Sequence, residues 1–231
     1  MQISISNSVG SRSKSNTPPI STDFISLWDT SLGDGNPTIA LPLYDGGNYY
    51  FTVNWGDGNS DVITAWDQLE VTHTYVTGGQ YTIIITGTIE GWSFNEIGDC
   101  GKLKKIQNIG ILKLGNIGGY FAGCNNLTSI KGTFDLTGVT NMSGMFSNCS
   151  SLTSVYRIKL WDVSAVTNMI AMFNGAVSFN TSLNLWDTSS VTSMDAMFSY
   201  ASSFNQDISS WNTSAVNSIC NGNNAFFNGY S

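Results

Sequence analysis

WDVSAVTNMIAMFNGAVSFN, residues 161–180, recurs 25 residues later as WDTSSVTSMDAMFSYASSFN, residues 186–205. A third copy starts at Trp211 with WNTSAVNSIC and then decays. Self-similarity at a fixed period of this length is the signature of a repeat protein. One repeat cannot bury its own apolar residues, so successive turns are predicted to stack against one another.

Earlier copies extend the repeat towards the middle of the chain. FDLTGVTNMSGMFSNCSSLTSV, residues 134–155, fits with two extra residues before Trp161, because Val139 and Val166 are 27 residues apart whereas Val166 and Val191 are 25 apart. Further upstream, YFAGCNNLTSI and DCGKLKKI keep the C-x-x-L-x-x-I spacing. The repeats are therefore predicted to cover residues 96–231 in about five turns.

Each repeat combines two patterns. Val-Thr-x-Met-x-x-Met-Phe places apolar residues at positions i, i+3 and i+4 of a short helix, which the threonine would cap. In one copy, Thr192 and Asp195 have the spacing of a capping box. The C-x-x-L-x-x-I or A-x-x-F part that follows is short and extended, and its copies are predicted to pair as a narrow parallel sheet. With strands about 4.8 Å apart, the stack would be on the order of 25 Å long.

Residues 23–95 are predicted to form a β-sandwich. Short β-rich runs such as FISLW, TIALPLY and YYFTVNW alternate with turn signals such as LGDGNP and GDGNSD. The runs EVTHTY and QYTIIITGTIEGW flank residues 76–79, which predicts a hairpin. Alternation within YYFTVNW places four large residues on the core face: Tyr49, Phe51, Val53 and Trp55.

Three segments of this first region resemble a known family. VNWGDG (residues 53–58), followed by THTY (72–75) and GQYT (79–82), is similar to the PKD-type immunoglobulin-like fold. That family serves mostly as a spacer and display module in surface proteins. The resemblance therefore implies a PKD-like β-sandwich with no catalytic residues to carry over.

The repeats resemble the BspA-type leucine-rich repeat family, in the branch with the FNQDISSW and VTxMxxMF motifs. Residues 204–211 and 191–198 carry these motifs here. The resemblance implies a right-handed, solenoid-like stack, as in surface proteins of bacteria, mycoplasma lipoproteins, protists and bacteriophage genomes. It also implies binding to other proteins or host surfaces without enzyme activity. The expected fold is mainly β with short helices: an arm (1–22), a PKD-like β-sandwich (23–95) and a leucine-rich-repeat solenoid of about five turns (96–231).

Charge is low and unevenly distributed. The formal net charge is −7 and the pI is about 4.4, which argues against a general nucleic-acid binder. Residues 16–100 contain eleven acids and no Lys or Arg, whereas residues 102–159 contain seven bases and one acid. This inversion marks a boundary near residue 100 and predicts that the front of the repeats faces the acidic module. The alternative interpretation is that both groups of charged residues simply lie on solvent-exposed faces and do not contact each other.

The Ser-rich arm, residues 1–22, carries Arg12 and Lys14 with no apolar run after them. It is therefore expected to be neither a signal peptide nor a membrane span, so that no standard secretion route is expected. We expect the arm to dock on other virion or surface proteins. In the decayed last copy, Phe226, Phe227 and Tyr230 either form a cap or meet a partner. The candidate partner contacts are therefore Arg12 and Lys14 in the arm, and Phe226, Phe227 and Tyr230 in the last copy.

Catalysis has few candidate residues, and the chain is predicted not to be an enzyme. His73 is the only histidine and is expected to be structural, given its place in an alternating strand. Asp57 and Asp61 could hold a calcium ion, although ordinary turn chemistry is the favoured explanation. There is no phosphate-binding loop, no paired metal-ligand motif and no nucleophilic serine motif. No cofactor or metal is expected.

Two ladders of repeated residues are predicted to lie in the core. The first contains cysteines at one repeat position: Cys100, Cys124 and Cys149, with Cys220 apart. A buried row of thiols is favoured, and disulfides between adjacent turns are the alternative. The second contains Trp161, Trp186 and Trp211, for which a binding hot spot is the alternative.

The function predicted from these features is structural recognition. The leading hypothesis is a bacteriophage virion surface component, such as a capsid- or tail-associated decoration or fibre protein. The repeats would bind a host surface protein or glycan, with no nucleic acid and no membrane insertion. The alternative is a bacterial cell-surface adhesion module located on the cell surface or outside the cell.

Overall fold

The computed structural model describes residues 22–217, which are mainly β and contain no α-helix. The strands are β1 Phe24–Asp29, β2 Thr38–Ala40, β3 Asn48–Asn54, β4 Ser60–Ile63, β5 Thr72–Thr74, β6 Gln80–Glu90, β7 Leu103–Asn108, β8 Leu112–Lys113, β9 Ser129–Ile130 and β10 Ser154–Val155. Three short 3₁₀ helices complete the list: η1 Leu69–Val71, η2 Gly98–Lys102 and η3 Ile158–Leu160. Within the same residues, no helix is long and apolar enough to cross a membrane.

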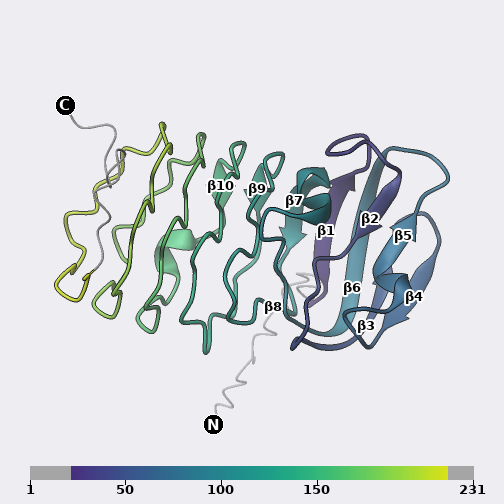
Figure 1. Ribbon diagram of the computed structural model, residues 1–231, viewed down its shortest axis with the longest axis horizontal. Helices are drawn as coiled ribbons and strands as arrows, with labels where there is room; N and C mark the ends of the chain where they lie inside the picture. Colours follow the sequence, from purple (N-terminus) through teal and green to yellow (C-terminus); the bar gives the residue numbers. More distant parts are fainter. Residues whose placement is uncertain (1–21, 218–231) are drawn as a thin grey trace, which may run out of the picture.

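One mixed eight-stranded sheet joins the two predicted modules. Its order is β10-β9-β7-β1-β6-β3-β4, with β8 paired to β6 (Figure 1). β1 is antiparallel to β6 on one side and to β7 on the other, whereas β7, β9 and β10 run parallel. The sheet therefore continues across the boundary predicted between residues 95 and 96.

The predicted hairpin around residues 76–79 is wrong. β5 pairs with β2 in a separate two-stranded sheet, whereas β6 pairs with β1 and β3. Tyr75, which directly follows β5, is held in the core, where its buried hydroxyl donates to the carbonyl of Trp55 at 2.9 Å. The loop then attaches to β1 instead, where the amide of Thr30 donates to the carbonyl of Gly79 at 3.0 Å.

The alternation predicted for YYFTVNW is confirmed. Along β3 the side chains are exposed and buried in strict turn, and Trp55, which follows the strand, is fully buried. The parallel pairing predicted for the C-x-x-L-x-x-I segments is also confirmed, in β7, β9 and β10.

Beyond β10 the chain forms successive turns that lie side by side (Figure 1). Backbone hydrogen bonds join each turn to the next. The amides of Met142, Gly144 and Phe146 each donate at 2.8 Å to carbonyls of the following turn. The bonds recur one repeat later, where the amides of Met169 and Ala171 donate to Ser193 and Asp195 at 2.9 and 2.8 Å. Neighbouring turns are thus held by a ladder as regular as that of a parallel sheet.

The short helices predicted for the Val-Thr-x-Met-x-x-Met-Phe segments are wrong, because these segments are turns. Alternate amides point to the next turn and so cannot bond four residues back within a helix. In addition, Gly144, Ala171 and Ala196 have positive φ angles of 60°, 53° and 53°, which interrupt a right-handed helix.

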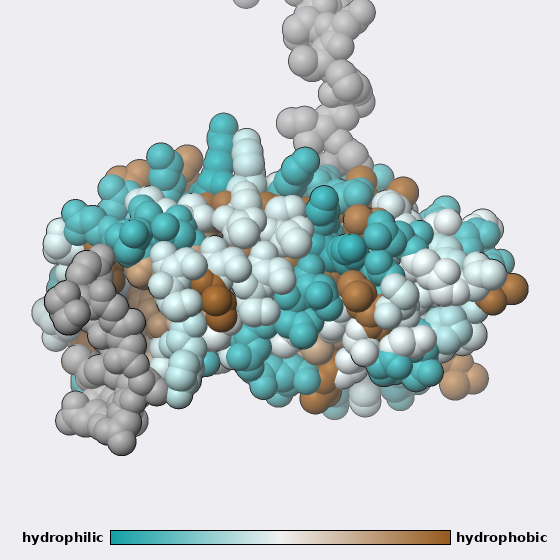
Figure 2. All heavy atoms as spheres, turned by 90° about the horizontal axis from the view of Figure 1, so that it is seen from above, coloured by the Kyte–Doolittle hydropathy of each residue, from teal (hydrophilic) through white to brown (hydrophobic). Residues whose placement is uncertain are grey.

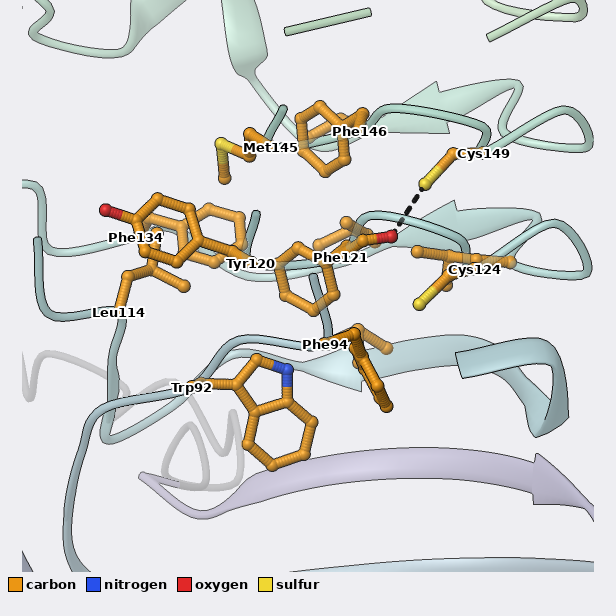
Figure 3. Packing of buried hydrophobic residues seen from close by; sticks show 14 of the residues in the cluster. Trp92, Phe94, Leu114, Tyr120, Phe121, Cys124, Phe134, Met145, Phe146 and Cys149 are labelled. Carbon is orange, nitrogen blue, oxygen red and sulfur yellow. Dashed lines mark hydrogen bonds between the residues drawn. The ribbon is translucent and has the colours of Figure 1, made fainter. Parts of the chain in front are cut away.

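One apolar core runs from the sheet through the turns. Near the junction, Trp92 and Phe94 lie below Phe121, and Phe146 lies above it (Figure 3). Phenylalanine rings continue the stack, with centroids 5.6 Å apart between Phe146 and Phe173. The core interpretation of the tryptophans is confirmed, since their rings stack at 6.3 and 6.0 Å with at most 8% exposure: Trp161, Trp186 and Trp211.

Ion pairs join the acidic first region to the basic segment, as the charge pattern predicts. The fully buried Lys102 places its Nζ 2.7 Å from Asp34 and 2.6 Å from Asp99. Lys104 lies 3.6 Å from Asp29. Burial opposes the charge on Lys102, but its hydrogen bonds to the two carboxylates prevail and raise its pKa. The hydrogen bond from Lys102 also lowers the pKa of Asp34 to about 2.

Candidate functional site

The parallel strands β7, β9 and β10 present two rows of polar side chains on the face opposite the core. Their central residues point inward and are buried: Ile106, Ile130 and Val155. Side chains alternate along a strand, so the residues on either side of these share the other face. The register places them in two rows: Lys105, Ser129 and Ser154, then Gln107, Lys131 and Tyr156.

A hollow of about 1010 Å³ lies where these strands end. All three residues of the second row line the hollow, and Arg157 and Thr133 add further polar groups. Thr22, the first residue that the structure describes, lines the same space. Segments from three distant parts of the sequence therefore meet at this hollow.

Tyr156 and Arg157 form the most distinctive pair in the hollow. The guanidinium carbon of Arg157 lies 5.2 Å from the centroid of the Tyr156 ring, which is the geometry of a cation–π contact. Tyr156 is 44% exposed. Arg157 has a φ of 51° and directly precedes η3. A guanidinium group and a partly exposed aromatic ring are thus held next to each other.

The side chains that line the hollow include bases and no acid. Three of the seven bases in residues 102–159 are in ion pairs: Lys102, Lys104 and Lys113. The other four form no ion pair within residues 22–217: Lys105, Lys131, Arg157 and Lys159. Lys131 and Arg157 both line the hollow, and its lining contains no Asp or Glu. The hollow is therefore suited to an anion.

A second hollow has the opposite character. It measures about 660 Å³ and is lined by Asp45, Glu90 and Asp135, with Lys113 as its only base. The Nζ of Lys113 lies 4.0 Å from Asp135, so the one cation there is already accompanied by an acid. Over the surface seen from above, polar residues predominate and hydrophobic residues are scattered (Figure 2). The basic hollow is consequently a local exception on an acidic protein.

His73 has structural contacts on every side, as predicted. Its Nε2 lies 2.8 Å from Asp57, its ring stacks on Trp55 at 5.0 Å, and the edge of Tyr75 meets it at 4.6 Å. Asp61 accepts a 2.8 Å hydrogen bond from the Trp55 indole. Both turn carboxylates are therefore engaged in holding the loop and the core.

The carboxylate of Asp57 balances two opposing effects. Desolvation raises its pKa, but the hydrogen bonds from His73 and Asn59 together lower it below the ordinary value. Across residues 22–217 there is no group of three or more His, Cys, Asp or Glu side chains that could hold a metal ion. Turn chemistry is sufficient to explain both aspartates.

The cysteine ladder lies in the core, and its members are free thiols. Cys124 and Cys149 are fully buried, and Sγ of Cys149 donates to the carbonyl of Phe121 at 3.1 Å (Figure 3). Burial raises the pKa of both thiols well above the ordinary value. Cys100 is partly buried, and Cys220 lies outside the described residues. Cys124 and Cys149 are thus packing groups with inert thiols.

The candidate partner contacts predicted from the sequence all lie outside the described residues: Arg12, Lys14, Phe226, Phe227 and Tyr230. The sequence reasoning missed Lys131, Tyr156 and Arg157. Two signals could have identified them. The basic segment contains all three, and the two extra residues before Trp161 fall in the loop that holds Arg157.

The stacked turns, the parallel ladders and the continuous core define a protein built of stacked repeats. Residues 115–229 match the family described as "Mycoplasma protein of unknown function, DUF285", which is related to BspA-like repeat proteins. No curated protein and no solved structure matches the chain significantly. The family match does not reach residues 23–95, so the PKD-type likeness there stays a prediction.

Proposed function

We propose that the protein is a non-enzymatic recognition protein, in which a PKD-like β-sandwich (23–95) carries a BspA-type leucine-rich-repeat solenoid (96–231). The observation that carries this proposal is the rigid stack of turns with rows of polar side chains at strand spacing. Such a surface is pre-organised, so binding it does not require ordering of the backbone.

The state of the reactive side chains supports a binding role. His73 is enclosed by Asp57, Trp55 and Tyr75, and the thiols of Cys124 and Cys149 are buried with raised pKa values. A nucleophile and a base within reach of each other would be needed for covalent catalysis. The basic hollow instead offers fixed cations, hydroxyls and an aromatic ring.

We further propose that the repeats are displayed on a bacteriophage particle and bind a host surface protein or glycan, with the arm docking on other virion proteins. The bacterial cell-surface adhesion module is the alternative. Quantitative mass spectrometry of purified particles and of cell envelopes separates the two. A fixed copy number per particle supports the virion role, presence only in the envelope supports the alternative, and absence from both contradicts display.

The recognition function itself is tested by binding of the full chain to candidate host cells and to arrays of glycans and surface proteins. Saturable binding that survives extensive washing supports it. Turnover of a substrate that disappears in His73→Ala, without any saturable binding, would overturn it in favour of an enzyme.

A further inference from the structure

We propose that the basic hollow at the ends of β7, β9 and β10 binds an acidic saccharide, a sugar chain with carboxylate or sulfate groups. Arg157 and Lys131 would contact the anionic group, and Tyr156 would contact the sugar ring. This inference rests on the recognition function proposed above and names the ligand class of one of its surfaces.

Charge is the first argument. Lys131 and Arg157 line a hollow without any acid, on a chain whose formal net charge is −7. The hollow therefore attracts an anion that most of the surface repels. The planar guanidinium of Arg157 can donate two parallel hydrogen bonds to a carboxylate or sulfate, which a single ammonium cannot do.

The neutral groups of the hollow favour a saccharide over an acidic peptide. Tyr156 offers a partly exposed aromatic ring, and Gln107 and Thr133 offer side chains that can both donate and accept hydrogen bonds. A sugar ring has one largely apolar C–H face and a rim of hydroxyls, so it matches both. A peptide would gain most from an unpaired strand edge; β9 is paired on both sides, with β7 and β10, so only β10, the last strand of the sheet, could offer one.

The backbone around these side chains is already fixed. The amide of Lys131 donates to Ile106 at 2.9 Å, and the amide of Tyr156 donates to Ile130 at 2.8 Å. The carbonyl of Arg157 accepts from Leu160 at 2.8 Å, which anchors the loop to η3. Binding therefore requires little ordering of the chain.

The protein's own N-terminal segment is a poor match for the hollow. Thr22 lines the space, so residues 1–21 are the nearest part of the chain in sequence. Those residues contain Arg12 and Lys14 and no acid. Like charges disfavour this segment as the occupant, and a partner of opposite charge is favoured.

The test measures binding of the full chain to four probes by calorimetry: a sulfated dextran oligosaccharide, an oligogalacturonate, neutral dextran of the same length and a poly-glutamate peptide. We expect binding to at least one acidic saccharide, little to neutral dextran and little to the peptide. Affinity should fall as salt concentration rises, because the contacts are partly solvated ion pairs.

Matched variants locate the site. Arg157→Gln and Lys131→Gln should each weaken binding about tenfold, the usual effect of losing one charge-assisted hydrogen bond. Lys159→Gln removes the same charge two residues away, outside the lining, and should change the dissociation constant less than about twofold. Tyr156→Phe should keep binding, whereas Tyr156→Ala should weaken it. Thermal unfolding of each variant excludes loss of fold.

The outcomes separate this inference from the function on which it rests. Saturable binding to host cells or particles without binding to any acidic saccharide would overturn the ligand class and leave recognition standing. Two further results would also overturn the ligand class: poly-glutamate binding as tightly as the acidic saccharides, or Lys159→Gln weakening binding as much as Arg157→Gln does. Either result would mean that the hollow attracts anions in general. Absence of binding to cells, particles and all probes would overturn both. A chain without residues 1–21 should retain the affinity, and loss of binding there would contradict the assignment of the hollow.

Discussion

Three tryptophans at equivalent repeat positions differ in a single hydrogen bond. The indole Nε1 of Trp186 donates to Ile158 at 2.7 Å, and that of Trp211 donates to Leu183 at 3.1 Å. The Nε1 of Trp161 is buried with no partner in the described part of the chain.

This difference predicts unequal effects of the same substitution. Trp161→Phe and Trp186→Phe lose similar apolar contacts, but only the former removes an unsatisfied buried donor. We expect Trp186→Phe to lower the free energy of unfolding by about 1–3 kcal/mol more than Trp161→Phe. Urea denaturation of both variants measures it. Equal losses would mean that the Trp161 N–H is satisfied in solution.

Lys102 is the residue on which the junction between the two charged regions depends. Its removal would leave Asp99, which is 12% exposed, without its cation. We expect Lys102→Met to destabilise the protein by about 3 kcal/mol, as for other broken buried pairs. Lys159→Met, on an exposed side chain, should change the unfolding free energy by less than about 0.5 kcal/mol. Chemical denaturation compares the two.

Acid stability depends on Asp34, which is also bonded to Lys102. Its folded-state pKa is about 2, below the ordinary value of 3.8. The carboxylate therefore contributes stability that is fully present above pH 3.8 and is lost as pH falls towards 2. In Asp34→Asn, we expect the melting temperature to fall less steeply between pH 4 and pH 2 than in the parent. Parallel slopes in thermal scans would contradict this role.

Among the elements, the segments between Val-Thr and Met-Phe show how one apolar spacing fits two structures. The i, i+3, i+4 pattern is real, and its methionines and phenylalanines are buried. A turn with alternate amides directed at the next repeat buries the same positions as a helix does. Intrinsic periodicity thus identified the core residues but not the backbone, because inter-turn hydrogen bonds override the local preference.

Substitution of Gly144 distinguishes a turn from a helix, because the expected change in the free energy of unfolding has opposite signs in the two structures. Gly144 has a φ of 60°, and an added Cβ would lie 3.9 Å from its nearest neighbours, so space is available. In a turn, Gly144→Ala should destabilise by about 1 kcal/mol through its left-handed conformation. In a helix it would stabilise by about 1 kcal/mol. Ala171→Gly, at the equivalent position, serves as the reverse control and should stabilise the turn.

The strands illustrate a second limit of sequence analysis. Alternation placed Phe51, Val53 and Trp55 in the core correctly, because burial depends on the strand's own period. Alternation could not predict which strands pair with β6. The neighbouring strand β5 also alternates, but it pairs with β2 in another sheet. For the basic hollow, the charge block and the insertion were visible. Its lining also needs Thr22 and Gly110, which only the folded chain brings there.

For the whole molecule, β1 is the element that unites both regions. It is hydrogen-bonded to β6 in the first region and to β7 at the start of the repeats. We expect Ile106→Ala, in the core of β7, to destabilise both regions by the same amount, about 2–5 kcal/mol. Hydrogen exchange of peptides from β3 and from residues 160–200 measures each region. Loss of protection in only one of them would show that they unfold independently.

The regular bonding between turns has an evolutionary consequence. Each turn presents to the next the same pattern of amides and carbonyls that it receives from the one before, as the bonds from Met142 and Met169 show. A duplicated 25-residue unit after residue 180 could therefore be inserted without a new interface. It would lengthen the protein by about 4.8 Å while leaving Lys131 and Arg157 in place. The length of the stack can consequently change in such a lineage independently of the side chains at the basic hollow.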